Sequence, residues 1–178
     1  MDFTTLFRLK ENLNLDKKTL AILRWIAIAG QFLAIYIVYF FLDFKFPLMA
    51  SLIIILIGSI SNLYLQFVVK AARIKDIFAG LILIYDLIQL SLLLYLTGGI
   101  SNPFSILLII PTIVSSTFLS MGTTIVLGSF TFFCLFLLSI FHYPLPGIHE
   151  NAFTFPKFYL AGFFISIIIG LIFLSYFG

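Results

Sequence analysis

The chain has 178 residues, of which 62% are hydrophobic, 18% are aromatic and 10% are charged, and its formal net charge is +3. Together with a mean hydropathy of +1.22, this composition excludes a soluble globular domain and indicates an integral membrane protein. The apolar runs have the length of about 20 residues that a helix needs to cross a bilayer, and they lack the alternation typical of membrane strands, so helical spans are predicted.

The predicted elements begin after a charged N-terminal tail, residues 1–19. Residues 20–178 are predicted to form one all-α domain, a bundle of six transmembrane helices. The predicted spans are 20–42, 47–69, 77–96, 102–120, 123–141 and 158–177. The division between the fourth and fifth spans rests on residues 120–124 alone, because no charged residue occurs between Asp86 and Glu150. A re-entrant fourth segment would move the C-terminus to the other side of the membrane.

Basic residues are concentrated on one side of the predicted bundle. Six spans place the N-terminal tail, the loop at residues 70–75 and the C-terminus on the same side, whereas Lys45 and Lys157 fall on the other. The positive-inside rule therefore predicts that both termini are cytoplasmic. The net charge follows from this topology, so the expected partner is the lipid bilayer and no nucleic acid is expected.

Polar side chains inside the first and third spans form a second feature. Asp86 lies about 14 Å along the third helix, near the middle of the bilayer, and Gln31 has a similar depth on the first. Gln89 lies on the same helix face as Asp86, and Arg24 can snorkel outward or reach toward the carboxylate. Two interpretations stay open, a proton-linked or quinone-linked relay and simple hydrogen-bonded packing between spans.

The turn between the third and fourth spans has the sequence GGISNPF. Gly98 and Gly99 allow unusual backbone geometry and a close approach at the end of the third helix. Asn102 suits an N-cap and Pro103 suits the first helical position, so the fourth helix is predicted to start here. A helix start offers N–H donors to a ligand, and Phe104 offers an aromatic face. A capped hairpin without a ligand is the alternative.

The remaining features are interpreted as structural. Pro111 is expected to free the carbonyl of Leu107 and kink the fourth span. Small residues repeat every four positions on the last span, which favours close helix packing; they are Gly162, Ser166 and Gly170. No metal site is predicted, because His142, His149 and Glu150 match no metal-binding spacing. Cys134, the single cysteine, is expected to be a packed thiol.

Three segments carry a resemblance to a known family. Residues 24–31 (RWIAIAGQ), 86–90 (DLIQL) and 95–104 (YLTGGISNPF) resemble the membrane domain of RegB/PrrB-type redox-sensing histidine kinases. The resemblance extends over essentially the whole chain. Five residues match the family's GGxxNPF motif position by position, namely Gly98, Gly99, Asn102, Pro103 and Phe104.

This resemblance implies a sensor domain in the bacterial inner membrane that has six spans and two cytoplasmic termini. It implies that ubiquinone binds at the periplasmic GGxxNPF turn, within a two-component signal transduction system, and that the chain dimerises through the kinase of a longer protein. The family's phosphoacceptor histidine and ATP-binding domain would lie beyond Gly178. No kinase catalytic residue is therefore expected in these 178 residues.

Two other functions remain open at this point. A six-helix substrate-binding subunit of a vitamin transporter has a similar size and span number, and it would copurify with a polar vitamin or an energising partner. A fragment with packing roles only is the third possibility. The sensor, by contrast, is expected to copurify with quinone.

Overall fold

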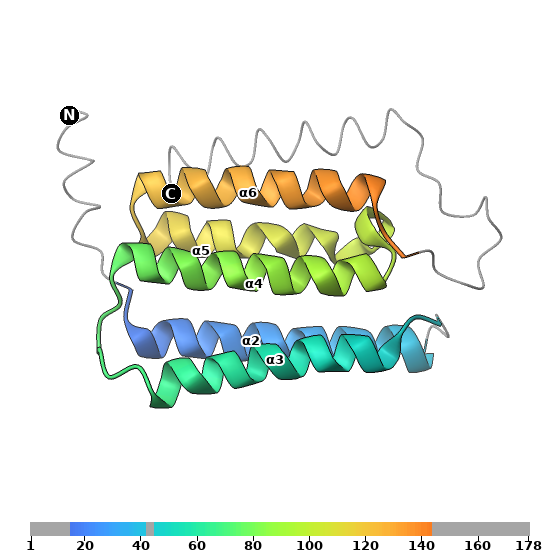
Figure 1. Cartoon of the computed structure of the whole chain (residues 1–178), viewed down its shortest axis with the longest axis horizontal. Helices are drawn as coiled ribbons and strands as arrows, with labels where there is room; N and C mark the ends of the chain where they lie inside the picture. Colours follow the sequence, from blue (N-terminus) through green and yellow to red (C-terminus); the bar gives the residue numbers. More distant parts are fainter. Residues whose placement is uncertain (1–14, 42–44, 144–178) are drawn as a thin grey trace.

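The computed structural model describes residues 15–41 and 45–143, which form an antiparallel helix bundle (Figure 1). The all-α fold class is confirmed. The elements in chain order are α2 (Lys17–Tyr36), the π-helical turn η1 (Ile37–Phe41), α3 (Leu48–Phe67), α4 (Asp76–Leu96), the 3₁₀ helices η2 (Gly99–Ser101) and η3 (Pro103–Ile109), α5 (Ile110–Phe118) and α6 (Met121–Ile140).

Four helical segments among the described residues are long and apolar enough to cross a membrane, and they make the chain a multi-pass membrane protein. They are Lys17–Phe41, Leu48–Phe67, Asp76–Leu96 and Met121–Ile140. These match the first, second, third and fifth predicted spans to within a few residues. The fourth predicted span corresponds to a shorter apolar helix, Phe104–Phe118. The sixth, 158–177, lies outside the described residues, as do the small-residue repeat, His149 and Glu150, so six spans stay a prediction.

Large apolar side chains cover the outward faces of the helices, as expected for lipid contact. Ile26 on α2 and Phe67 on α3 are 65% and 76% exposed. The inward positions of α5 and α6 instead carry small polar residues, which hydrogen-bond between the helices. The oxygens of Thr112 and Thr131 are 3.0 Å apart, as are those of Ser115 and Thr124. Such contacts replace the hydrophobic effect as the source of helix association in lipid.

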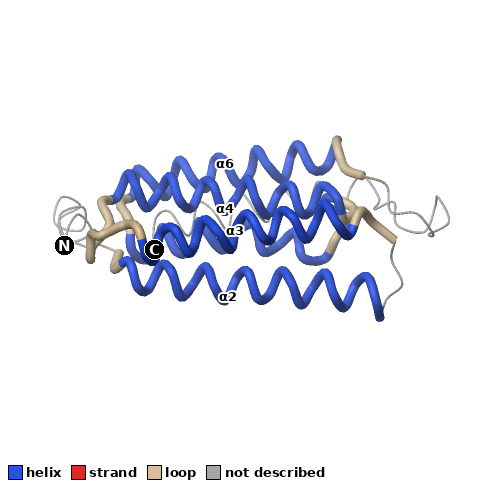
Figure 2. The backbone as a smooth tube through the Cα atoms, turned by 60° about the horizontal axis from the view of Figure 1, so that its bottom comes forward, coloured by secondary structure: helices blue, strands red, loops and turns tan. Residues whose placement is uncertain are grey.

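The helices fall into two groups. The α2–α3 hairpin lies on one side, and α4, α5 and α6 lie together on the other (Figures 1 and 2). Helix α3 contacts α4 across the boundary between the groups. Helix α2 packs mainly against α3, so polar contacts between α2 and α4 help to show how the two groups are held together.

One end of the bundle, called here the basic end, is closed by hydrogen bonds between loops and helix ends. Lys17 donates from Nζ to the carbonyl oxygens of Gln66 and Val69, over 3.1 and 2.7 Å. The carboxylate of Asp76 accepts from the backbone N–H of Ser120 over 2.7 Å and also from the Thr123 hydroxyl. These bonds connect α2 to α3 and α4 to α6, and the basic loop residues Lys70, Arg73 and Lys75 lie at the same end.

Pro111 does not lie in the interior of an α-helix as expected, and its predicted effect on the Leu107 carbonyl is wrong. Residues 103–109 are 3₁₀-helical, and the α-helix begins only at Ile110, so Pro111 occupies one of its first positions. Proline is tolerated there because the N–H groups of the first turn have no intrahelical partner. The carbonyl of Leu107 is not free either, since it accepts from the N–H of Ile110. Pro111 therefore marks a change from 3₁₀ to α geometry.

Candidate functional site

The glycines of the GGxxNPF turn are required by the backbone and by α6. Gly98 and Gly99 have φ angles of 101° and 60°, in the left-handed region that favours glycine. A Cβ on Gly99 would lie 2.7 Å from the carbonyl oxygen of Leu138 and 2.5 Å from the Cβ of His142. Gly99 therefore allows the turn to pack directly against the end of α6.

Asn102 holds the turn together, as its predicted role as an N-cap requires. Its Oδ1 accepts from the N–H of Phe104 over 2.9 Å, and its Nδ2 donates to the carbonyl and hydroxyl oxygens of Thr97 over 3.1 and 2.8 Å. The backbone carbonyl of Asn102 accepts from the N–H of Ser105 over 2.9 Å. The side chain is thus a bridge between the end of α4 and the start of η3.

This capping overturns one part of the sequence interpretation. The helix start was expected to offer N–H donors to a ligand, but Pro103 has no N–H, and those of Phe104 and Ser105 are already bonded to Asn102. A ligand that needs hydrogen-bond donors must find them elsewhere. Polar side chains that carry such donors lie on α2 and α4.

Arg24 on α2 and Asp86 on α4 form a partly buried ion pair. The Nε of Arg24 lies 2.9 and 3.0 Å from the two carboxylate oxygens, and its Nη2 lies 2.8 Å from Oδ1. The same Nη2 donates to the hydroxyl of Ser61 on α3 over 2.6 Å. Arg24 is 5% exposed. Of the two geometries considered for this side chain, the structure has the one that reaches inward.

Gln31 and Gln89 form a second contact between the same two helices. The Nε2 of Gln89 donates to the Oε1 of Gln31 over 3.1 Å. Gly58 on α3 makes this arrangement possible, because a Cβ there would lie only 2.2 Å from that Nε2. The four polar residues expected to cluster therefore make two separate pairs, each of which joins α2 to α4. Their functional role stays a prediction.

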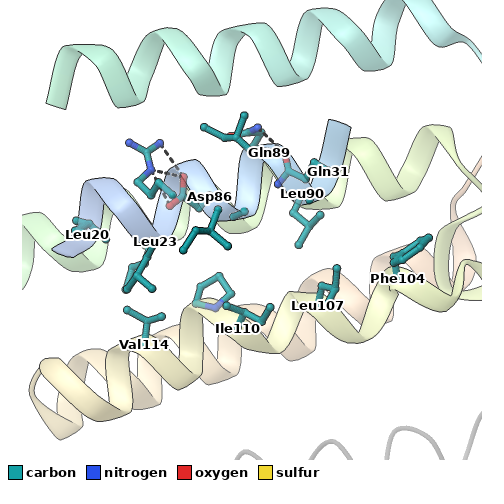
Figure 3. Close-up of a pocket in the computed structure, with 17 residues that line it drawn as sticks. Leu20, Leu23, Gln31, Asp86, Gln89, Leu90, Phe104, Leu107, Ile110 and Val114 are labelled. Atoms are coloured by element: carbon teal, nitrogen blue, oxygen red, sulfur yellow. Dashed lines mark hydrogen bonds and ion pairs between the residues drawn. The ribbon is translucent and has the colours of Figure 1, made fainter. Parts of the chain in front are cut away.

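A cavity of about 330 Å³ lies between α2, α4 and η3–α5, and both polar pairs line it. Figure 3 shows Leu107, Ile110 and Val114 pointing from η3–α5 toward Leu23 and Leu90 on the facing helices. Among the described side chains of the GGxxNPF turn, Phe104 alone lines this cavity. A smaller hollow of about 40 Å³ extends from it toward Thr97 and Asn102.

The site thus separates the residues of the motif by role. Gly98, Gly99 and Asn102 shape the turn and contact protein groups, whereas Phe104 faces the cavity together with the ion pair and the amide pair. Mostly apolar walls with a few convergent donors and acceptors are typical of sites for small organic ligands. The arrangement fits a mostly apolar small molecule that carries a few polar atoms.

Sequence reasoning missed part of the cavity wall. Phe104, Leu107, Pro111 and Val114 recur every three or four residues, which is the spacing of one helix face. That spacing identifies one face of the helix, and only the packing of η3–α5 against α2 and α4 makes that face a cavity wall. Gly30 was also missed: it lines the cavity, and a Cβ there would meet no atom within 4 Å. The metal expectation is not tested at His149 and Glu150, which the structure does not describe.

Comparisons with known proteins agree with the expected resemblance. No family model and no solved structure matches the chain. Among curated proteins, the sensor histidine kinase RegB of Cereibacter sphaeroides is 35% identical to it over 159 residues, which is 89% of this chain. The chain spans about a third, 34%, of the length of that kinase. The predicted similarity to RegB-type kinases is therefore confirmed for nearly all of these residues.

Proposed function

We propose that this RegB-like membrane region is the input part of a sensor histidine kinase, and that it responds to the redox state of ubiquinone. One observation carries the proposal. Phe104, the last residue of the GGxxNPF turn, lines the same cavity as the Arg24–Asp86 and Gln31–Gln89 pairs. The family resemblance associates the GGxxNPF motif with ubiquinone, and Phe104 connects this motif to a cavity whose walls are suited to binding a quinone.

The cavity meets the main requirements of a quinone ring. Its volume of about 330 Å³ lies at the lower end of the range of roughly 300 to 1,000 Å³ that ligand sites occupy. Leucine, isoleucine and valine side chains supply contact for the ring and its methyl groups, and the polar pairs supply partners for its oxygens. Ubiquinone carries out two-electron redox chemistry when it is bound; the protein supplies binding and orientation.

The membrane helices also indicate a route for the ligand. The cavity walls belong to apolar segments, so a ligand with an isoprenoid tail would enter from the bilayer and leave its tail in the lipid. Phe104 would contact the ring, and Asn102 would hold the backbone that carries Phe104. The turn thus acts through the position of Phe104 rather than through its own N–H groups.

The orientation in the membrane and the partners belong to the same proposal. The positive-inside rule favours a cytoplasmic location for the basic end, which would put the GGxxNPF turn at the periplasmic side of a bacterial inner membrane. Both termini would be cytoplasmic with six spans. In a longer protein, the bundle would pass its signal to a kinase that dimerises.

The test uses the single tryptophan of the chain, Trp25, which adjoins Arg24 on α2. Purified chain in lipid nanodiscs is titrated with ubiquinone-1, and quenching of Trp25 fluorescence gives Kd. Phe104→Ala is expected to weaken binding by about 1 kcal/mol beyond the lost apolar contact. Phe133→Ala, on a lipid-facing residue that is 52% exposed, is the matched control and leaves Kd unchanged. Equal Kd values for both variants would contradict the proposal, and copurification of a polar vitamin would favour the transporter alternative.

A further inference from the structure

We infer that the Arg24–Asp86 ion pair contacts one ring oxygen of the bound ligand, and that the residue making this contact changes when the ligand is oxidised or reduced. Arg24 donates to the carbonyl oxygen of the quinone, and Asp86 accepts from the hydroxyl of the quinol. The inference rests on the proposed function, because it needs a quinone in the cavity. It assigns the recognition of the redox form to residues outside the GGxxNPF turn.

The ion pair retains hydrogen-bonding capacity that its own contacts do not use. Arg24 bonds to Asp86 and Ser61 through Nε and Nη2. Among the described residues no hydrogen bond involves Nη1, which leaves its N–H groups for a ligand. The guanidinium carbon also lies 5.6 Å from the centre of the Tyr85 ring. The carboxylate accepts two contacts at Oδ1 and one at Oδ2, so Oδ2 can accept a further bond. The Asp86 side chain is 21% exposed, in a residue that lines the cavity.

The quinone and the quinol differ in whether their oxygens can donate a hydrogen bond, and this difference determines which residue of the ion pair each form contacts. A quinone oxygen has no hydrogen and can only accept, so within the ion pair it can bond only to Arg24. A quinol hydroxyl can donate, and an ionised carboxylate is a strong acceptor of such a bond. Two charged residues with opposite hydrogen-bonding character line the same cavity, Arg24 on α2 and Asp86 on α4.

The amide pair provides for the other oxygen of the ring. Gln89 follows Asp86 by three residues on α4, which corresponds to a rise of about 4.5 Å on one helix face. A para-quinone has its oxygens at opposite ends of the ring, so a ring lying along α4 can reach both pairs. Because Gln89 donates to Gln31 through one amide group, the pair keeps both a donor and an acceptor for a ligand. The amide pair can therefore bind either redox form.

The consequence is a hydrogen bond that moves from α2 to α4 when the ligand is reduced. In the oxidised form the ligand contacts Arg24, which belongs to the α2–α3 hairpin. In the reduced form it contacts Asp86, which belongs to the α4–α6 group. In each form the ligand bonds to one member of the ion pair, and the two members belong to different helix groups.

The first test uses the wild-type chain in nanodiscs and infrared difference spectroscopy of ubiquinone-1 labelled with ¹³C at one carbonyl and then at the other. We expect unequal carbonyl bands, with the larger downshift at the oxygen that contacts the guanidinium. On reduction of the bound ligand, the carboxylate band of Asp86 is expected to shift. Asp86→Asn assigns that band by removing it.

The second test compares Kd for ubiquinone-1 and ubiquinol-1. Asp86→Asn exchanges a charge-assisted bond for a neutral one, so the quinol is expected to lose about tenfold more affinity than the quinone. Ser61→Ala is the matched control: it removes another partner of Arg24 at a residue outside the cavity wall, and the ratio of the two Kd values stays unchanged. Circular dichroism checks that each variant is folded, and the carbonyl bands of the wild-type chain still test the inference if Asp86→Asn is not.

The outcomes separate this inference from the proposed function. Unequal carbonyl bands with selective loss of quinol affinity support it. If the wild-type chain binds both forms but the carbonyl bands are equivalent, or if folded Asp86→Asn changes both Kd values equally, the ion pair is structural and the inference is overturned while the proposed function stands. If the wild-type chain binds neither form, both are overturned.

Discussion

Gly58→Ala should weaken ligand binding while it leaves the stability of the bundle nearly unchanged. The new Cβ would lie 2.2 Å from Nε2 and 2.4 Å from Oε1 of Gln89, so the amide must move by about 1 Å to reach ordinary contact. That movement breaks the 3.1 Å bond to Gln31, a loss of about 1 kcal/mol. Alanine has a higher helix propensity than glycine, which stabilises α3 by about 1 kcal/mol. The two effects therefore nearly cancel in the free energy of unfolding.

In Gly58→Ala the higher helix propensity of alanine does not offset the effect on ligand binding. If one ring oxygen bonds to the amide pair, loss of about 1 kcal/mol raises Kd for ubiquinone about fivefold. Fluorescence titration measures Kd, and thermal unfolding in nanodiscs measures stability. Gly122→Ala is the matched control, because the nearest atom to its Cβ, Oγ of Ser120, lies 4.0 Å away. An unchanged Kd in Gly58→Ala, with Gln89 shown to be displaced, would refute the role of the amide pair.

Two further predictions concern the parts of the site that hold the ligand-facing residues in place. Gly99→Ala should lower the free energy of unfolding by at least 1–2 kcal/mol, roughly the penalty of a left-handed alanine, because its Cβ also meets the end of α6; thermal unfolding checks this, and an unchanged midpoint would contradict it. Arg24→Ala should destabilise the bundle by about 3–5 kcal/mol, since it leaves Asp86 unpaired. The double variant Arg24→Leu/Asp86→Leu should unfold at a higher temperature than Arg24→Ala, and the reverse order would show that the charge itself stabilises the fold.

Much of the bundle follows from local properties of the sequence. Apolar runs of membrane length locate α2, α3, α4 and α6, and the choice of Asn102 as N-cap depends only on its neighbours along the chain. The similar depths of Gln31 and Gln89 were also predictable, because both helices start at the same end and rise equally per residue. The two side chains are hydrogen-bonded in the structure. These features need little knowledge of which helices are neighbours.

The rest depends on tertiary contacts. The close approach of Gly58 to Gln89, and the cavity itself, exist only once α3 and α5 have been placed against α4. The expectation of free N–H donors at the turn failed for a different reason: the side chain and carbonyl of Asn102 consume the donors of Phe104 and Ser105. The same residue that identifies the helix start thus removes the binding groups that a helix start would offer.

The central claim is that ubiquinone binds in the cavity between α2, α4 and η3–α5, and the Gly30→Leu variant tests it most directly. Gly30 lines the cavity, and a Cβ there meets no atom within 4 Å, so a leucine side chain has open space at its first atom. We expect Gly30→Leu to remain folded and to lose measurable quenching of Trp25 by ubiquinone-1, whereas Gly122→Leu, outside the cavity, keeps the wild-type Kd. Wild-type binding by folded Gly30→Leu would contradict the account.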